Sequence, residues 1–227
     1  RVKLFIDSAD LEKDQNIIDY YPVDGITTNP KILADCDIEE EKMLPTIREF
    51  VSRNDILVFV QVTGETADEM VKQAVTLKKC FGKTLIVKIP AVKEGYKAVR
   101  MCKNEGIKVC VTVIHSTMQA FVAAKAGADY VAPYISHIDN LGGDGVVSVE
   151  EMLEIFRNGE YSCKVLGASF RTVDQVKRLA VAGCDAVTIT PEMFEMLIAH
   201  SATDQSMVKF SGAWRDKFGD YQVDNLV

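Results

Sequence analysis

The sequence lacks several features that would place it in a common class of protein. No apolar run approaches the roughly 18 residues that a membrane-spanning helix needs. The segment Arg1–Asp7 reads as a β-strand and has no signal-peptide layout. The net charge of −7 comes from 26 basic and 33 acidic residues, so binding a nucleic acid would gain little from counterion release. We therefore expect a cytoplasmic protein that uses neither a membrane nor a nucleic acid as its partner.

Metal-binding, disulfide and hydrolase motifs are also missing. The six cysteines include no CxxC pair, which favours reduced and mostly buried thiols. The three histidines, His115, His137 and His200, are scattered and form no HExxH motif. There is no GxSxG nucleophile elbow, and the glycines of Gly142–Gly145 lack the spacing of a dinucleotide loop. We expect no metal and no other cofactor, and we interpret Gly142–Gly145 as a turn.

Eight short apolar segments, rich in β-branched residues, alternate with segments long enough for a helix. They are Lys3–Asp7, Gly25–Thr28, Leu57–Val62, Thr84–Ile89, Lys108–Ile114, Tyr130–Ile135, Lys164–Phe170 and Ala186–Thr190. Near-continuous Val/Ile runs are typical of parallel strands buried on both faces. A spacing of about 26 residues suits the repeated unit of a (β/α)8 barrel. The fold class predicted is α/β, a TIM barrel. An open doubly wound sheet is the main alternative.

Helix start signals agree with this scheme. Thr66–Glu69 and Thr172–Gln175 have the spacing of capping boxes, so a helix should follow each threonine. Pro191 suits the first turn of the last barrel helix.

A further helix is predicted after the barrel. With no linker in view, we expect residues 1–227 to form one domain, in which about 1–200 make the barrel and about 204–220 make the extra helix. That helix carries Met207, Val208, Phe210 and Trp214 at helical spacing. Such a face should pack either on the barrel or on another subunit.

Nearly every predicted strand ends in a hydrogen-bonding side chain. These residues are Asp7, Thr28 with Asn29, Gln61, Lys88, Thr112, Tyr134, Ser169 with Arg171, and Thr188 with Thr190. Barrel enzymes place their active sites at the C-terminal ends of the strands. These side chains therefore predict a single polar active site at the C-terminal end of the barrel.

Lys88 is the most informative of these residues, because it interrupts the apolar run Leu85–Pro90. A buried lysine is disfavoured as the charged ammonium ion, and a neutral amine attacks ketones to form a Schiff base. A buried lysine paired with a carboxylate is the structural alternative. Asp7 could act as a general acid and base or could cap the first helix, although Asp10 is the better cap candidate.

The segment Ser169–Thr172 combines a hydroxyl, a guanidinium and the start of a helix. Free backbone N–H groups at such a start, together with Arg171, would bind an anion. A simple helix cap is the alternative.

Five segments form a recognisable set of motifs: Leu4–Asp7, Gly25–Pro30, Ile86–Pro90, Val131–Tyr134 and Gly167–Arg171. Together they resemble the transaldolase family, most closely its small bacterial members, the fructose-6-phosphate aldolases and short transaldolases. The similarity extends over nearly the whole chain. It implies a metal-independent aldolase in which Lys88 forms a Schiff base and Asp7 moves the proton of the breaking bond.

The resemblance also implies roles for the other residues. Asn29, with Thr28 beside it, corresponds to residues that bind the dihydroxyacetone unit. Gln61 and Thr112 correspond to a pair that holds a proton-shuttling water, and Ser169 and Arg171 to a phosphate site. The tyrosine at position 134 favours assignment to the fructose-6-phosphate aldolases, because transaldolases have phenylalanine at this position.

The implied partners are a sugar phosphate and dihydroxyacetone, and the implied assembly is a homo-oligomer, a pentamer or a decamer. One position departs from the family, since His137 stands where an arginine usually helps to bind phosphate. The expected activity is therefore cleavage or formation of fructose 6-phosphate from dihydroxyacetone and glyceraldehyde 3-phosphate. Transfer of the dihydroxyacetone unit, as by a transaldolase, is the alternative, and a catalytically silent phosphosugar-binding barrel is a more remote one.

Overall fold

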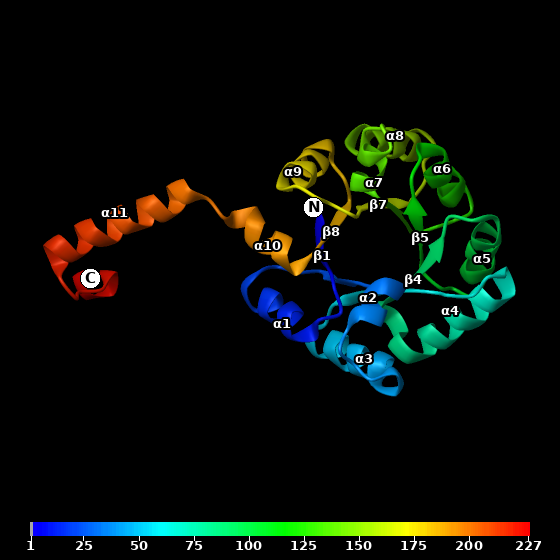
Figure 1. Cartoon of the computed structure of the whole chain (residues 1–227), viewed down its shortest axis with the longest axis horizontal. Coiled ribbons are helices and arrows are strands. Elements are labelled where there is room, and N and C mark those ends of the chain that lie inside the picture. The colour runs from blue at the N-terminus through cyan, green and yellow to red at the C-terminus, as the bar shows by residue number, and fades with distance from the viewer. Residues whose placement is uncertain (1) are drawn as a thin grey trace.

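The computed structural model describes residues 2–227 and shows a closed barrel of eight parallel strands (Figure 1). The strands are β1 (Lys3–Asp7), β2 (Gly25–Thr27), β3 (Leu57–Gln61), β4 (Leu85–Pro90), β5 (Val109–Ile114), β6 (Tyr130–Pro133), β7 (Lys164–Gly167) and β8 (Ala186–Ile189). Strands adjacent in sequence pair with each other, and β1 pairs with β8 to close the barrel. The predicted (β/α)8 barrel is confirmed, and the open doubly wound sheet is excluded.

Helices surround the barrel and cover the outer faces of the strands (Figure 1). They are α1 (Leu11–Tyr20), α2 (Pro30–Asp35), α3 (Met43–Asn54), α4 (Ala67–Phe81), α5 (Lys93–Asn104), α6 (Thr117–Lys125), α7 (Ile135–Asn140), α8 (Gly145–Asn158), α9 (Val173–Ala182), α10 (Pro191–Ile198) and α11 (Ser201–Phe218), with 3₁₀ helices η1 (Glu40–Lys42), η2 (Gly82–Thr84) and η3 (Val223–Leu226). Both predicted capping boxes form, at Thr66 and at Thr172. Pro191 opens α10 as predicted.

Apolar side chains form two separate layers. The larger layer lies between the strands and the helices, and it includes most of the buried Val and Ile residues. The smaller layer fills the barrel interior, where Phe59 packs edge-on against both Phe5 and Tyr130 at centroid distances of 5.2 and 5.4 Å. Phe5 and Phe59 lie in the middle of their strands and Tyr130 begins β6, so these rings close the interior below the polar residues at the strand ends.

The glycine at the start of β2 is required by the closeness of β3. A Cβ atom at Gly25 would lie 2.3 Å from the carbonyl oxygen of Leu57, well inside van der Waals contact. Any larger residue would force the two paired strands apart. This glycine therefore helps to set the position of Thr27, Thr28 and Asn29, which follow it at the barrel mouth.

The ends of β6 and β7 lie furthest from the sequence prediction, while β5 ends at Ile114 as predicted but is irregular inside its bounds. β6 ends at Pro133 because Ile135 already begins α7. β7 ends at Gly167, and Ser169 then takes a left-handed backbone conformation with φ of 59°. β5 contains a register shift between Val111 and Ile114, and Val113 has φ of 60°, which is strained for a β-branched residue. The polar residues at these ends therefore lie on bulges and turns.

The last long helix extends away from the barrel (Figure 1). α11 begins at Ser201, earlier than the predicted position near residue 204, because the His200 side chain caps it by accepting the N–H of Ala202. None of its residues is buried, and Met207 and Phe210 are 57% and 63% exposed. The predicted apolar face is present, but the barrel does not cover it. Across residues 2–227, no helix combines the length and the apolar character that crossing a membrane requires.

Candidate active site

A cavity of about 270 Å³ opens at the C-terminal ends of the strands. Its lining contains five of the residues predicted to act in catalysis or substrate binding, and they come from five different βα units. These are Asp7, Asn29, Lys88, Tyr134 and Ser169. Lys31, Thr27, Thr188 and His137 also line it, together with apolar groups from Ala132, Leu166 and Ala168. The cavity therefore brings an amine, a carboxylate, a phenol and several hydroxyls around a single small space.

Lys88 lies in the centre of this arrangement. β4 is buried along most of its length, and the lysine itself is 5% exposed. Its Nζ donates a hydrogen bond of 2.8 Å to the backbone carbonyl oxygen of Thr28. A neutral acceptor holds the amine in place but, unlike a bonded carboxylate, does not neutralise the ammonium charge. The buried amine is thus oriented by β2 while remaining at the surface of the cavity.

Asp7 faces the same space from the end of β1. Its Oδ1 accepts a hydrogen bond of 2.7 Å from the Thr27 hydroxyl, which is itself hydrogen-bonded to the hydroxyl of Thr188. Burial raises the pKa of Asp7 above its ordinary value, and the charge of Lys88 and the Thr27 bond only partly oppose this. Asp10 caps α1 by accepting the N–H of Lys13, as predicted. Asp7 is therefore free of a capping role.

Tyr134 and Thr112 approach each other at the ends of the neighbouring strands β6 and β5. The Tyr134 hydroxyl lies 3.3 Å from the Thr112 hydroxyl, and either oxygen could be the donor. Thr112 is fully buried and precedes the strained Val113, so the bulge in β5 sets its orientation. A phenol and an aliphatic hydroxyl in this position can pass a proton between solvent and a group in the cavity.

Two histidines pack beside Tyr134 at the rim. The Nδ1 atom of His137 lies 3.3 Å from the Nε2 atom of His115, and the two rings are stacked. The Nδ1 atom of His115 lies 3.0 Å from the carbonyl oxygen of Val113, which the bulge turns towards the mouth. Because a carbonyl oxygen can only accept, the Nδ1 atom of His115 is the donor in this contact. His137 thus reaches the cavity rim from α7 in a defined orientation.

The other predicted residues lie next to the cavity and do not line it. Gln61 pairs with Lys88 in the β3–β4 register and lies on the same interior face of β3 as Leu57 and Phe59, although it borders a neighbouring groove and is not part of the cavity lining. The Thr28 hydroxyl donates to the backbone of Phe59, so this residue reaches the site only through its carbonyl oxygen, which accepts from Lys88. Asn29, which does line the cavity, uses its side-chain oxygen to cap α2 by accepting from Ile32, which leaves its amide NH₂ group for a ligand.

The expected anion site after β7 differs from the sequence prediction in one respect. The backbone N–H groups of Arg171 and Thr172 are not free, because both donate to the side-chain oxygen of Gln175, at 2.8 and 3.2 Å. The capping box that made the helix predictable also occupies these donors. The Ser169 hydroxyl and the Arg171 guanidinium are the side-chain groups of this loop that remain for an anion.

Lys31 was missed by the sequence reasoning. It lies in the first turn of α2, lines the cavity and pairs with Asp35 one turn later. Its position two residues after Asn29 places it at the mouth, which is the signal that could have identified it. Among residues 2–227, no group of three or more His, Cys, Asp or Glu side chains is arranged to hold a metal ion.

Comparisons with known proteins agree on a family. The family described as "Transaldolase/Fructose-6-phosphate aldolase" matches residues 4–224. A protein named "Probable transaldolase" from Desulforapulum autotrophicum is 38% identical over 216 residues, which cover 95% of this chain and 99% of that protein. Another of the same name, from Lactiplantibacillus plantarum, is 34% identical over 214 residues, covering 94% of this chain and 97% of that protein.

A solved structure described as "Native KDPGal structure" superposes with a TM-score of 0.58. It is 13% identical in sequence, and the match covers 82% of this chain and 81% of the other. At that identity the likeness concerns the barrel fold alone.

Proposed function

Because the chain belongs to the transaldolase/fructose-6-phosphate aldolase family, we propose that it cleaves or forms a ketose phosphate through a Schiff base on Lys88. The Nζ atom attacks the ketone carbon, and loss of water leaves a protonated imine. The bond that breaks joins the third and fourth carbons of the ketose. Asp7 takes the proton of the hydroxyl on the fourth carbon, and that oxygen becomes the carbonyl of the released aldehyde. The bonding electrons move into the imine, leaving an enamine on Lys88.

The fate of the enamine separates two reactions. Protonation of its carbon and hydrolysis of the imine release dihydroxyacetone, which is the aldolase outcome. Attack on an acceptor aldehyde transfers the three-carbon unit instead, which is the transaldolase outcome. We favour the aldolase, acting on fructose 6-phosphate to give dihydroxyacetone and glyceraldehyde 3-phosphate. The observation that carries this choice is the 3.3 Å approach of the Tyr134 and Thr112 hydroxyls, which can hold a proton-donating water together with Gln61.

The transaldolase reading is the second candidate, and the names of the similar proteins support it. A cheap comparison distinguishes the two. Fructose 6-phosphate is supplied with and without erythrose 4-phosphate, and release of dihydroxyacetone is compared with transfer. Removing the phenol in Tyr134→Phe should cost the protonation branch one hydrogen bond, about 1–3 kcal/mol, and so slow cleavage by roughly ten- to a hundredfold.

The transfer branch needs no such proton, so the ratio of transfer to cleavage should rise in this variant. If both activities fall together, or if neither changes, the reason for preferring the aldolase is removed. Borohydride reduction in the presence of dihydroxyacetone tests the shared step. A catalytically silent barrel would show no added mass, and labelling that survives Lys88→Ala would show that another residue is the nucleophile.

The phosphate of the substrate would lie at the rim, where Ser169, His137 and Lys31 line the cavity and Arg171 follows two residues after Ser169. Histidine is only partly charged near neutral pH, so this anion site is weaker than one with arginine at position 137. The amide of Asn29 would bind the dihydroxyacetone end, next to Lys88 and Asp7.

We further propose that residues 1–227 act as one domain of a homo-oligomer, a pentamer or a decamer, working in the cytoplasm without a cofactor. The uncovered apolar residues of α11 support the oligomer, because an isolated helix with an apolar face gains stability only when another surface covers it.

A further inference from the structure

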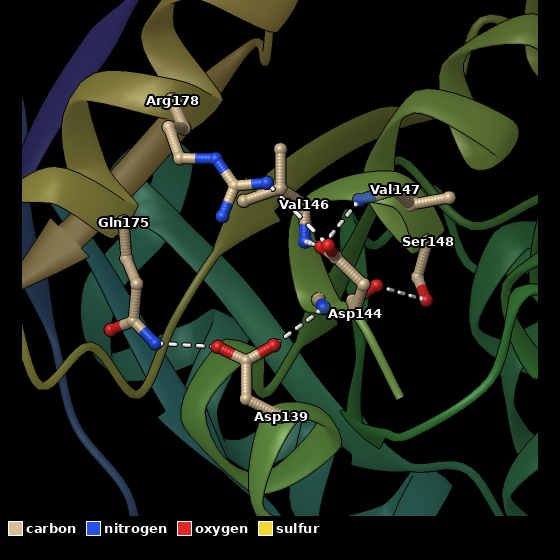
Figure 2. A network of polar contacts seen from close by, with 8 residues as sticks. Asp139, Asp144, Val146, Val147, Ser148, Gln175 and Arg178 are labelled. Atoms are coloured by element: carbon tan, nitrogen blue, oxygen red, sulfur yellow. Dashed lines mark hydrogen bonds and ion pairs between the residues drawn. The ribbon is translucent and has the colours of Figure 1, made fainter. Parts of the chain in front are cut away.

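Gln175 connects three segments beside the cavity. Figure 2 shows its contact with Asp139. It lies in the first turn of α9, and its side chain points towards α7. Its Nε2 atom donates to Oδ2 of Asp139 in α7 at 2.6 Å. The other carboxylate oxygen of Asp139 accepts the N–H of Gly145, at the start of α8, at 2.7 Å. One side-chain amide therefore joins the loop after β7 to the helices that follow β6.

The orientation of this amide follows from its partners. Arg171 and Thr172 offer backbone N–H groups, which can only donate, so they must face the side-chain oxygen of Gln175. A carboxylate such as Asp139 can only accept, so it must face the NH₂ group. Every contact agrees with a single orientation, and neither a glutamate nor an aliphatic residue could make the full set.

A second contact joins the same two segments closer to the cavity. The backbone N–H of Ser136 donates to the carbonyl oxygen of Ser169 at 2.8 Å, and the Ser136 hydroxyl donates to the same oxygen. Ser169 has a left-handed backbone, which is uncommon for serine. Ser136 directly precedes His137, so the rim residues of β7 and α7 are held by a shared set of hydrogen bonds.

Two other helices show which part of this arrangement goes beyond helix capping. Glu69 in α4 and Gln119 in α6 occupy the same position of a capping box, and each accepts two backbone N–H groups, as Gln175 does. Glu69 has no amide NH₂ group. In the part of the chain that the structure describes, the NH₂ group of Gln119 has no hydrogen-bond partner. Capping thus needs only an oxygen, and the donation to Asp139 is the additional feature at Gln175.

We propose that Gln175, through Asp139, is a positioning residue that holds the loop of Ser169 and Arg171 in register with His137 for recognition of the substrate's phosphate group. The inference rests on the function proposed above and deepens it. If the hydrogen bond between Gln175 and Asp139 is lost, the loop of Ser169 and Arg171 can move away from His137. Lys88 and Asp7, on β4 and β1, keep their own contacts. Phosphate recognition should then weaken, and Schiff-base formation should remain.

The test uses the Michaelis constant for fructose 6-phosphate and the inhibition constant of inorganic phosphate. Gln175→Glu keeps the capping oxygen but places a second carboxylate against Asp139. We expect both constants to rise by roughly 10- to 100-fold, as for a misplaced binding group. Borohydride trapping of dihydroxyacetone, which has no phosphate, should stay within about twofold of the unmodified protein.

Two matched variants make the test specific. Gln119→Glu makes the same chemical change in a capping box without an acidic partner, and it should leave both constants unchanged. Combining Gln175→Glu with Asp139→Asn reverses the donor and the acceptor, so it should restore both constants to within roughly threefold. A merely structural role would lower thermal stability without this rescue.

Several results would overturn the proposal. The first is that Gln175→Glu leaves the Michaelis constant and the phosphate inhibition constant unchanged. The second is that these constants are as high in the Gln175→Glu/Asp139→Asn double variant as in the single variants. Trapping that fails already in the unmodified protein would point instead to a failure of the proposed Schiff-base function, which separates the two ideas.

Discussion

Asp14 is a buried acid whose replacement should stabilise the protein in a pH-dependent way. It lies in the first turn of α1 with its side chain fully buried, and neither carboxylate oxygen has a hydrogen-bond partner. Burial raises its pKa to about 7 from an ordinary value of 3.8, and the negative charges of Asp10 and Asp7 add to this. The Ser8 hydroxyl and Lys13 lie near enough to oppose the shift in part, but no hydrogen bond reaches the carboxylate.

The sign of the effect follows from linkage between protonation and folding. The folded state holds the proton more tightly than the unfolded chain, so this residue costs no stability below a pH of about 4. The cost grows as the pH rises towards 7 and is constant above it. A shift from 3.8 to about 7 corresponds to about 4 kcal/mol at alkaline pH. About 2–3 kcal/mol of that develops between pH 5 and pH 8.5.

Asp14→Leu removes the charge and fills the same space with an apolar side chain. The unfolding free energy, measured by urea denaturation at pH 5 and pH 8.5, should exceed that of the unmodified protein by more at the higher pH. Glu12→Leu, an exposed acid of the same helix, is the matched control and should show no such pH dependence. An equal gain for Asp14→Leu at both pH values would show that Asp14 is not a strained buried acid.

Three further predictions concern catalysis and assembly. Asp7→Asn should still be trapped on Lys88 by borohydride but should cleave slowly, by roughly 10²–10⁴-fold. Because burial raises the pKa of Asp7, the acidic limb of the unmodified protein's pH–rate profile should lie above the range of an exposed aspartate, and near-normal turnover of the variant would contradict its role. His137→Arg should lower the Michaelis constant for fructose 6-phosphate without affecting trapping of dihydroxyacetone, and an unchanged constant would place the anion elsewhere. Sedimentation of the unmodified protein should give a mass several times the 25.1 kDa of one chain, and Phe210→Asp in α11 should reduce it. A 25.1 kDa species at micromolar concentration would refute the oligomer.

The barrel was predictable because its signals are local and repeated. Each strand contributes a short apolar run, and each helix start has its own cap, as at Thr66 and Thr172. The strand ends were harder to predict, because tertiary contacts decide them. Ser169 and Val113 leave the extended conformation only in the context of their neighbours, and no residue type in the sequence marks that change.

The candidate site was partly predictable for the same reason. Lys88 was identifiable because a charge inside an apolar strand is rare, and Asp7 because a better cap followed it. The pairing of Lys88 with the Thr28 carbonyl oxygen joins residues 60 positions apart, and no local pattern encodes it. Asp14 shows the opposite case, since nothing in its sequence context distinguishes a buried aspartate from an exposed one on α1.

The closure of the barrel by β1 and β8 has a consequence for how the chain is made. The first strand is synthesised more than 180 residues before its partner, since β1 begins at Lys3 and β8 at Ala186. At a synthesis rate of about 5–20 residues per second, the edge of β1 that pairs with β8 stays unpaired for roughly 10–40 s on the growing chain. Unpaired strand edges invite pairing with other chains. Lys3 and Asp7 place a charge at each end of the apolar Leu4-Phe5-Ile6 core, which is the arrangement that keeps a waiting strand from aggregating.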